Sequence, residues 1–176
     1  MKTKFMEKGD VTLRPLEVSD AEFMRDILIH PDVRNTIGRP PKPVNIEAQR
    51  NWIKEVTRNS DEAHFLIEHN GKKAGNISIN GLESEYRKGE FGVSVHPDHQ
   101  EKGIGTIAVK LIVDYGFETL NRHKIRGGYL EGNEASKRVM EKAGFQEEGI
   151  ERDYKYVDGE WKNVHWMSIL EEEYYD

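Results

Sequence analysis

One stretch of the chain, Glu90–Tyr115, constrains the fold more than any other. It opens with apolar Phe91, Val93 and Val95 separated by small or polar residues, an alternation typical of a half-buried strand. Because Pro97 cannot donate a ladder hydrogen bond, the strand is expected to end just before it. After a short loop, apolar residues recur at helical spacing and form one stripe, at Ile104, Ile107, Ala108, Leu111, Ile112 and Tyr115. The predicted order is therefore strand, glycine-bearing loop, helix.

The glycine-bearing loop has two interpretations. The first turn of a helix leaves backbone N–H groups without partners, and glycines such as Gly103 and Gly105 let a ligand approach the backbone closely. Together with the helix dipole, these groups form a site for phosphate or diphosphate. Alternatively, the two glycines only permit a tight turn, and their spacing alone leaves both interpretations open.

Three phosphate-binding patterns can be compared with this loop. The P-loop pattern G-x-x-x-x-G-K-S/T is absent from the chain, which excludes a P-loop NTPase. Gly103, Gly105 and Ala108 fit G-x-G-x-x-A, but a dinucleotide site wants an acidic residue about 20 positions on, where this chain has Arg122–Arg126. The run Gln100–Gly105 fits Q/R-x-x-G-x-G/A, and it resembles the acetyl-CoA loop of the GNAT N-acetyltransferase superfamily.

Composition limits the class of protein. A length of 176 residues suits one domain with a real core, and no linker or repeat is visible, so residues 1–176 are predicted to form a single domain. The net charge is −6 with scattered basic residues, so no nucleic-acid partner is expected. No apolar run is long enough for a membrane span and no signal peptide is visible, so no membrane partner and a cytoplasmic location are expected. The absence of cysteine excludes disulfides and a thiol nucleophile.

Metal binding is not expected either. The seven histidines are scattered, and no spacing typical of a metal site is evident.

Periodicity and turn signals predict an alternation of strands and helices over the whole chain. Asn45 is expected to cap a helix, Gly144 to end one, and Asn70-Gly71 and Asp158-Gly159 to turn hairpins. The acidic tail Glu171–Asp176 is expected to be frayed. Strands are expected at Val11–Leu16, Phe65–Ile67, Ala74–Ile79, Phe91–His96, Lys124–Leu130, Gln146–Val157 and Trp161–Leu170, with helices in between.

Three further segments strengthen the resemblance. Glu131–Phe145 resembles the N-x-x-S-x-x-V-x-E-K-x-G-F segment of the RimJ/RimL-type branch of the GNAT superfamily. Leu13–Leu16 followed by Asp20 resembles that branch's opening strand, and Gly159–Leu170 resembles its last strand. The resemblance implies the GNAT fold, an α/β fold. Its central sheet is mixed, mostly antiparallel and splayed between the fourth and fifth strands, with helices on both faces.

The resemblance also implies acetyl-CoA as cosubstrate and a set of residues that bind it. The backbone of the fourth strand would pair with the pantetheine arm through Val93, Ser94 and Val95. The loop and helix start would hold the diphosphate through Gln100, Glu101, Lys102, Gly103, Ile104, Gly105 and Thr106. Asn133 would contact the pantetheine from the other side, although it also stands where a plain helix N-cap is expected.

Two residues are candidates for the proton transfers. Ser136 could protonate the leaving thiolate, as the N-x-x-S segment of the family implies, or it could be a first-turn serine bonded to the backbone. Glu90 could accept the amine's proton, or it could be a solvated glutamate at the end of a strand. Polyamine-acetylating relatives place a tyrosine where this chain has Met140, and relatives often carry an aspartate where it has Asn163.

Three functions remain open at this stage. The first expectation is acetylation of a primary amine, namely a protein or peptide N-terminal α-amine. The alternatives are acetylation of a small amine, such as a polyamine or aminoglycoside, and a non-catalytic sensor module that binds acyl-CoA. A homodimer is expected only from the habit of the family.

Overall fold

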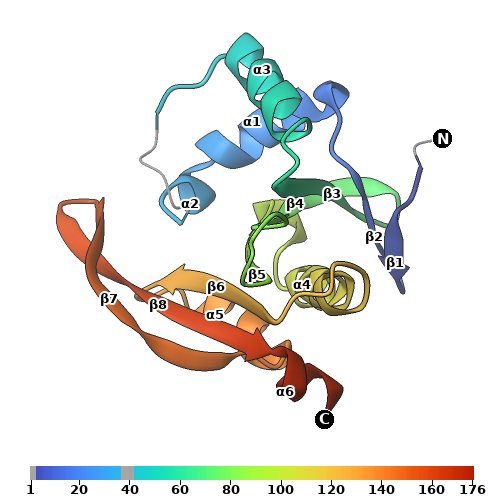
Figure 1. Cartoon of the computed structure of the whole chain (residues 1–176). Helices are drawn as coiled ribbons and strands as arrows, with labels where there is room; N and C mark the ends of the chain where they lie inside the picture. The colour runs from blue at the N-terminus through green and yellow to red at the C-terminus, as the bar shows by residue number, and fades with distance from the viewer. Residues whose placement is uncertain (1–2, 37–41) are drawn as a thin grey trace.

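A mixed sheet of eight strands runs through the computed structural model, which describes residues 3–36 and 42–176 (Figure 1). The strand order is β1-β2-β3-β4-β5-β6-β8-β7, and only β5 and β6 pair in parallel. The strands are β1 Met6–Lys8, β2 Val11–Pro15, β3 Glu62–His69, β4 Lys72–Asn80, β5 Lys88–Val95, β6 Lys124–Leu130, β7 Gln146–Val157 and β8 Glu160–Leu170. The predicted mixed, mostly antiparallel sheet is therefore confirmed.

Helices cover both faces of this sheet (Figure 1). On one face α4 packs against β2, β4 and β5, while α1 packs against β4 and α3 against β3 on the other. The helices are α1 Ala21–Ile29, α2 Pro31–Arg34, α3 Ile46–Val56, α4 Ile104–Asp114, α5 Glu134–Lys142 and α6 Glu171–Tyr175. Short 3-10 turns occupy Val18–Asp20 and Pro97–His99, and a π-helical turn, Tyr115–Thr119, follows α4.

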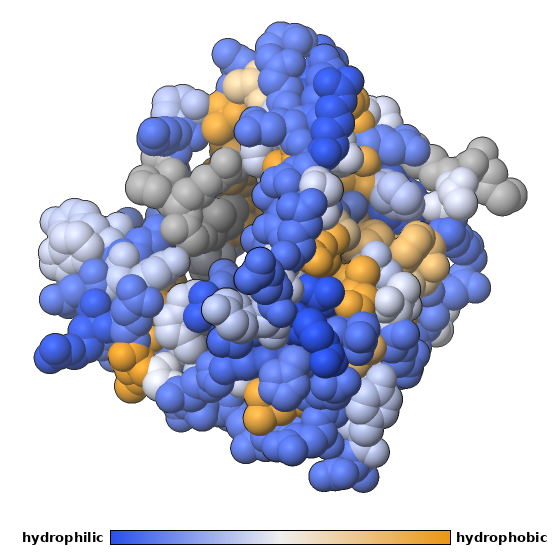
Figure 2. All heavy atoms as spheres, in the orientation of Figure 1, coloured by the Kyte–Doolittle hydropathy of each residue, from blue (hydrophilic) through white to orange (hydrophobic). Residues whose placement is uncertain are grey.

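Alternation along β3 shows how the two faces form separate cores. Phe65 and Ile67 are buried against α4, whereas Leu66 between them is buried with Met24 and Ile53 of the other helical layer. Neighbouring side chains of a strand point to opposite faces, so one strand supplies both cores. The face seen in Figure 2 is mostly hydrophilic, because these apolar side chains are inside. None of the helices within residues 3–36 and 42–176 combines the length and apolar character needed to cross a membrane.

The predicted caps and turns are confirmed. The Asn45 side chain accepts a hydrogen bond from the Ala48 N–H at 2.8 Å and so caps α3. Both hairpin turns place their two central residues at positive φ, at Asn70-Gly71 and at Asp158-Gly159. Gly144 also has a positive φ, of 93°, directly after α5.

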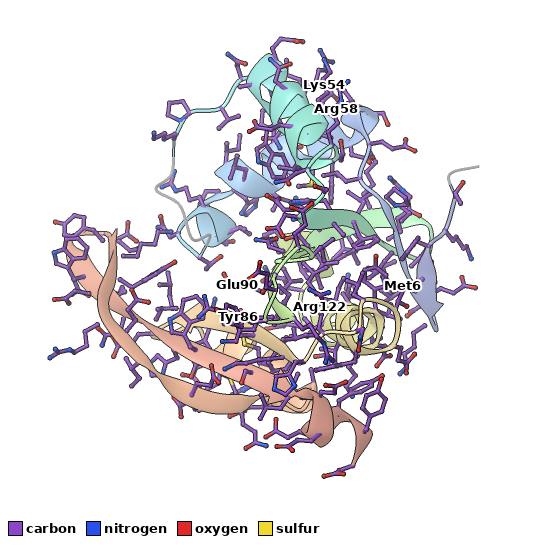
Figure 3. The ribbon with its side chains drawn as sticks, in the orientation of Figure 1. Met6, Lys54, Arg58, Tyr86, Glu90 and Arg122 are labelled. Atoms are coloured by element: carbon purple, nitrogen blue, oxygen red, sulfur yellow. The ribbon has the colours of Figure 1, made fainter. Side chains whose placement is uncertain are left out.

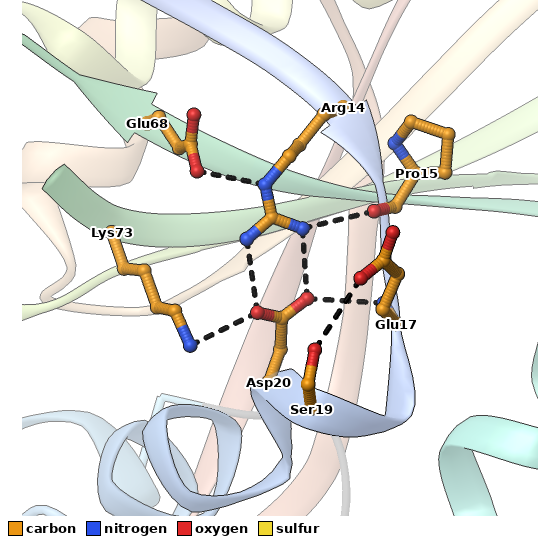
Figure 4. Close-up of polar contacts among 7 residues, drawn as sticks. All are labelled: Arg14, Pro15, Glu17, Ser19, Asp20, Glu68 and Lys73. Atoms are coloured by element: carbon orange, nitrogen blue, oxygen red, sulfur yellow. Dashed lines mark hydrogen bonds and ion pairs between the residues drawn. The ribbon is translucent and has the colours of Figure 1, made fainter. Parts of the chain in front are cut away.

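An ion-paired cluster ties the start of α1 to the sheet (Figure 4). The Arg14 guanidinium on β2 donates to both carboxylate oxygens of Asp20 at 2.8 and 2.9 Å and to Glu68 at 2.7 Å. Lys73 lies 3.0 Å from the same Asp20 carboxylate. Burial disfavours the charged form of Asp20, yet the hydrogen bonds from Arg14 and Lys73 outweigh it and hold the pKa of Asp20 well below its ordinary value.

Two ends of the chain differ from the prediction. A short strand, β1, precedes the predicted first strand, so the strand expected to be fourth is β5 and its parallel neighbour is β6. The tail is not frayed but forms α6, whose Tyr174 hydroxyl donates to Asp114 at 2.9 Å and to Glu118 at 2.8 Å. Those partners lie far away in sequence, so local composition could not reveal them.

The two parallel strands separate along their length. Their pairing covers only Lys88, Gly89 and Glu90 on β5, opposite Lys124–Arg126 on β6. From Phe91 to Val95, β5 pairs with β4 alone. Within the described residues, one backbone edge of this segment therefore has no strand partner, which is the splay that the resemblance to the family implied.

Candidate active site

A cavity of about 420 Å³ opens beside the unpaired edge of β5, between the first turns of α4 and α5. All of the residues predicted to bind the cosubstrate line it except Lys102. They are Val93, Ser94, Val95, Gln100, Glu101, Gly103, Ile104, Gly105, Thr106, Asn133 and Ser136. The chain thus brings three separate sequence segments together around one space. That these residues bind a ligand stays a prediction.

The unpaired strand edge forms one wall. A strand without a neighbour presents N–H and C=O groups at its edge, ready to bond an extended chain. In this chain those groups lie along Phe91–Val95, and β4 occupies only the opposite edge. The wall therefore suits an extended ligand carrying amide groups.

The start of α4 forms a second wall. Gly103, the residue before the helix, has a left-handed φ of 76°, and no side chain caps the helix. The N–H groups of Ile104, Gly105 and Thr106 make no hydrogen bond with any residue that the structure describes. Unbonded N–H groups at the positive end of an 11-residue helix attract anions.

Two predicted side chains hold the loop in shape through hydrogen bonds to backbone carbonyls. Gln100 donates through Nε2 to the Val95 carbonyl at 3.0 Å, which ties the loop back to the end of β5. The Lys102 ammonium donates to the Asp98 carbonyl at 2.7 Å. Glu101 holds a φ of 60°, a conformation that L residues adopt uncommonly. The loop conformation is therefore held by bonds within the loop and strand.

The start of α5 supplies the third wall. Asn133 accepts a hydrogen bond from the Ser136 N–H through Oδ1 at 3.1 Å, so the N-cap interpretation is confirmed. That bond leaves the Asn133 Nδ2 group as a donor on the cavity. The Ser136 hydroxyl makes no hydrogen bond within the described residues, in contrast to the alternative in which it bonds the backbone.

Several lining residues were missed by the sequence analysis. Arg138 and Lys142 reach the same cavity from α5, and their spacing of four residues, one helical turn, was a signal that could have revealed them. His99 also lines it, with a buried Nδ1 atom that has no hydrogen-bond partner among the residues that the structure describes. Burial, together with nearby Lys102, lowers the pKa of His99. No pattern in the sequence singled out this histidine.

A second cavity, of about 270 Å³, lies between β4 and β5 and the two helices α1 and α3. Apolar residues of α1 and Trp52 of α3 line it, with the carboxamides of Gln49 and Asn76. Ser94 lines both cavities. The two cavities therefore meet at one residue of the splayed strand.

Glu90, the predicted base, lies elsewhere. It sits near the start of β5 (Figure 3), and its carboxylate is 2.7 Å from a guanidinium nitrogen of Arg126, which stacks on Trp166 at 4.4 Å. Glu90 lines neither cavity. Ser94 stands four positions further along the strand, about 13 Å along the backbone. The structure does not bring this carboxylate to the meeting point, and its role as base stays a prediction.

Metal-ligand side chains do not gather at this site. Across the described parts of the chain, no group of three or more His, Asp or Glu side chains could hold a metal ion.

Comparison with known proteins places this geometry in context. The family described as "Acetyltransferase (GNAT) domain" matches residues 10–146. A spermidine N(1)-acetyltransferase of Escherichia coli is 29% identical, covering 93% of this chain and 88% of its own. A protein of Bacillus subtilis named "Probable N-acetyltransferase YjcK" is 33% identical, covering 94% and 97%.

A solved structure resembles the chain over nearly its whole length. It is the spermidine N-acetyltransferase of Vibrio cholerae in complex with CoA and spermine, with a TM-score of 0.88 and 25% identity. The similarity covers 96% of this chain and 100% of that one.

Proposed function

The chain belongs to the GNAT acetyltransferase family, and on this premise we propose that it acetylates a small primary amine, with polyamines as the first acceptors to test. The family is one of N-acetyltransferases, and acetyl-CoA supplies the acetyl group. The observation that carries the proposal is the meeting of two cavities at Ser94, beside an unpaired strand edge. A two-substrate transfer needs such a meeting point.

The first cavity is proposed as the acetyl-CoA site. The amide groups of pantetheine would pair with the free edge of β5, and the Asn133 Nδ2 group would donate to it from α5. The diphosphate would lie at the unbonded N–H groups of α4, with Arg138 and Lys142 adding positive charge.

The transfer itself requires three actions at Ser94. A neutral amine must reach the thioester carbonyl from the second cavity, and a backbone N–H of β5 would stabilise the oxygen on which negative charge develops. The C–N bond forms as the C–S bond breaks, the Ser136 hydroxyl would supply a proton to the departing sulfur, and the proton that the nitrogen loses would restore the hydroxyl, so that the products are the amide and the free thiol. Met140 has no proton to donate, and it is buried and lines neither cavity. Ser136 is the hydroxyl-bearing side chain that α5 places at the first cavity.

The named relatives favour a small amine over the N-terminal α-amine that was expected first. Two are spermidine acetyltransferases, and one of these was solved with spermine. The peptide α-amine remains the second candidate, because the second cavity has no carboxylate among its described lining residues for a polycation. Membership of the RimJ/RimL-type branch and a homodimer stay predictions.

An acceptor comparison tests this assignment. Spermidine, spermine, an aminoglycoside and peptides with free or blocked N-termini would each be mixed with acetyl-CoA, following thiol release and product mass. We expect a polyamine to give a kcat/KM at least tenfold above the free peptide. Faster reaction of the peptide with a free N-terminus would reverse the order of the two candidates. Tight acetyl-CoA binding without transfer to any amine would support the sensor module instead.

The cofactor site has its own test. Gly105→Asp adds a side chain that fits sterically, since its Cβ would lie 3.5 Å from Val139, but it puts negative charge at the start of α4. We expect CoA affinity to fall at least tenfold, about 1.4 kcal/mol. The matched control is Gly149→Asp on β7, where an added Cβ meets no atom within 4 Å. Equal CoA affinity of the two variants in calorimetry would refute this location of the diphosphate.

A further inference from the structure

The chemistry of the second cavity is unusual for a site that receives an amine. Its walls are apolar, from Met24, Ile27 and Leu28 of α1 and Trp52 of α3. None of the described residues that line it carries a charge. An ammonium ion entering this cavity would lose its water without meeting a carboxylate, which is unfavourable. The lining therefore discriminates against the protonated form of an amine.

Two uncharged polar groups stand in these apolar walls without partners. Gln49 is only 2% exposed, yet its carboxamide makes no hydrogen bond with any described residue. Asn76 lies directly opposite Ser94 in the β4–β5 register, and its side chain has no such bond either. Because both residues line the cavity and neither side chain is bonded within the described residues, their carboxamide donors and acceptors are available to a ligand there.

We propose that this cavity binds the acceptor as an uncharged primary amine on an apolar stem, held by the carboxamides of Gln49 and Asn76 next to Ser94. This inference rests on the proposed function. The amine N–H groups donate to the carboxamide oxygens, its lone pair stays free for the thioester carbonyl, and its methylene stem lies against Met24, Leu28 and Trp52. The proton leaves the ammonium ion for bulk water before entry, so the cavity needs no base of its own.

Ionisable groups on the surrounding elements lie outside this lining. The His64 ring on β3 packs edge-on against Trp52 at 5.6 Å and is bonded to Glu62 at 2.6 Å. Figure 3 labels Lys54 on α3 and Arg58 just after the end of that helix, and neither lines the cavity. The elements that line the cavity also carry charged residues that are not among its lining residues: Glu22, Arg25 and Asp26 on α1, Glu47, Arg50 and Glu55 on α3, Lys72 and Lys73 on β4, and Lys88 and Glu90 on β5, with Glu90 paired to Arg126 on β6.

Ligand binding at different pH values tests the protonation state directly. Calorimetry on the CoA-saturated protein would compare phenethylamine with phenethyl alcohol, which has the same skeleton and no charge. An alkylamine has a pKa near that of lysine, about 10.4, so its neutral fraction rises about tenfold per pH unit between pH 7 and 9. We expect the apparent affinity of the amine to rise by that factor while that of the alcohol stays constant. An amine affinity that does not change with pH, or no binding of the amine, would overturn the proposal.

Two substitutions at one position test the role of Gln49. Gln49→Leu removes the carboxamide at similar size and should weaken phenethylamine binding at least tenfold. Gln49→Glu supplies a carboxylate, and it should flatten the pH dependence because the ammonium form then has a partner. The control is Gln146→Leu on β7, outside both cavities. Near wild-type amine binding by Gln49→Leu, or an unchanged pH slope in Gln49→Glu, would contradict the proposal, provided that CoA affinity shows each variant to be folded.

The design separates this inference from the function on which it rests. Binding is measured without turnover, so absence of transfer to every amine would refute the proposed function while leaving the binding result to stand. Normal transfer by the wild type, together with unaffected amine binding by Gln49→Leu, would refute only the inference.

Discussion

Arg14 shows at the scale of single residues how a buried charge can order a functional layer. Its side chain is the largest of those that are fully buried, and its guanidinium donates hydrogen bonds to Asp20 and Glu68. Asp20 stands at the start of α1, the helix that carries Met24 and Leu28 to the second cavity. The ion pair therefore fixes the start of the helix that forms one wall of the second cavity.

Replacing Asp20 by Asn should reveal this role in stability. It leaves the Arg14 charge buried with less compensation, and we expect a loss of about 3–5 kcal/mol in urea unfolding. The exposed pair Lys4–Glu7 is the control, and Glu7→Gln should change the unfolding free energy by no more than about 1 kcal/mol. A loss below about 1 kcal/mol for Asp20→Asn would show that Glu68 alone satisfies Arg14.

The lowered pKa of Asp20 also predicts a pH dependence. A carboxyl whose folded pKa is depressed contributes stability above its unfolded value, here 3.8, and loses it as the pH falls toward the folded pKa. The wild type should therefore lose unfolding free energy as the pH drops below about 4. The Asp20→Asn variant should lose less over the same range, and parallel pH curves for the two proteins would contradict this.

Ser136 gives a kinetic prediction. If its hydroxyl protonates the thiolate, Ser136→Ala should lower kcat at least tenfold while CoA affinity stays within about twofold. Ser60, an exposed serine bonded to Glu83, supplies the control Ser60→Ala. A kcat near that of the wild type would reduce Ser136 to a residue of the helix start.

Single residues also show what the sequence can and cannot predict. The resemblance of two motifs to those of the GNAT family located the lining residues of the first cavity. It did not foresee that Gln100 would bond the Val95 carbonyl, or that Glu90 would pair with Arg126 on a neighbouring strand. Those bonds depend on strand register, which only the folded sheet establishes.

At the scale of elements, the close approach of β4 to β5 sets the position of Ser94, the residue at which the two cavities meet. A Cβ on Gly75 would lie 2.3 Å from the Ser94 carbonyl oxygen, so only glycine permits the observed distance between these strands. The register of β3 and β4 also shifts near this glycine, at Ile67/Glu68. Periodicity predicted both strands, but this local contact could not be predicted because it joins residues from different strands.

Gly75→Ala should therefore displace β5 at Ser94. We expect kcat/KM to fall at least tenfold, with a loss of stability of about 1–3 kcal/mol from overpacking. Gly149→Ala, on a strand where an added Cβ meets nothing, is the control and should keep full activity. Activity of Gly75→Ala equal to that control would show that the position of β5 at Ser94 is not critical.

At the scale of the whole molecule, the splayed sheet places two cavities on either side of one strand. The acetyl-CoA side is built from β5, α4 and α5, and the amine side from α1, α3 and β4. The first side could be predicted because its segments resemble motifs of the family. The second side is made of apolar helix residues, whose pattern is the same whether they fill a core or line a cavity.

The affinity of a bisubstrate ligand tests the central claim, that acetyl-CoA and the amine meet at Ser94. CoA joined through an acetyl bridge to an alkylamine would occupy both cavities at once, with its nitrogen as an uncharged amide. Calorimetry should give a Kd at least tenfold below that of CoA alone, about 1.4 kcal/mol of added binding free energy. A Kd equal to that of CoA would mean that the alkylamine part of the ligand gains no binding free energy in the second cavity. That result would contradict the account.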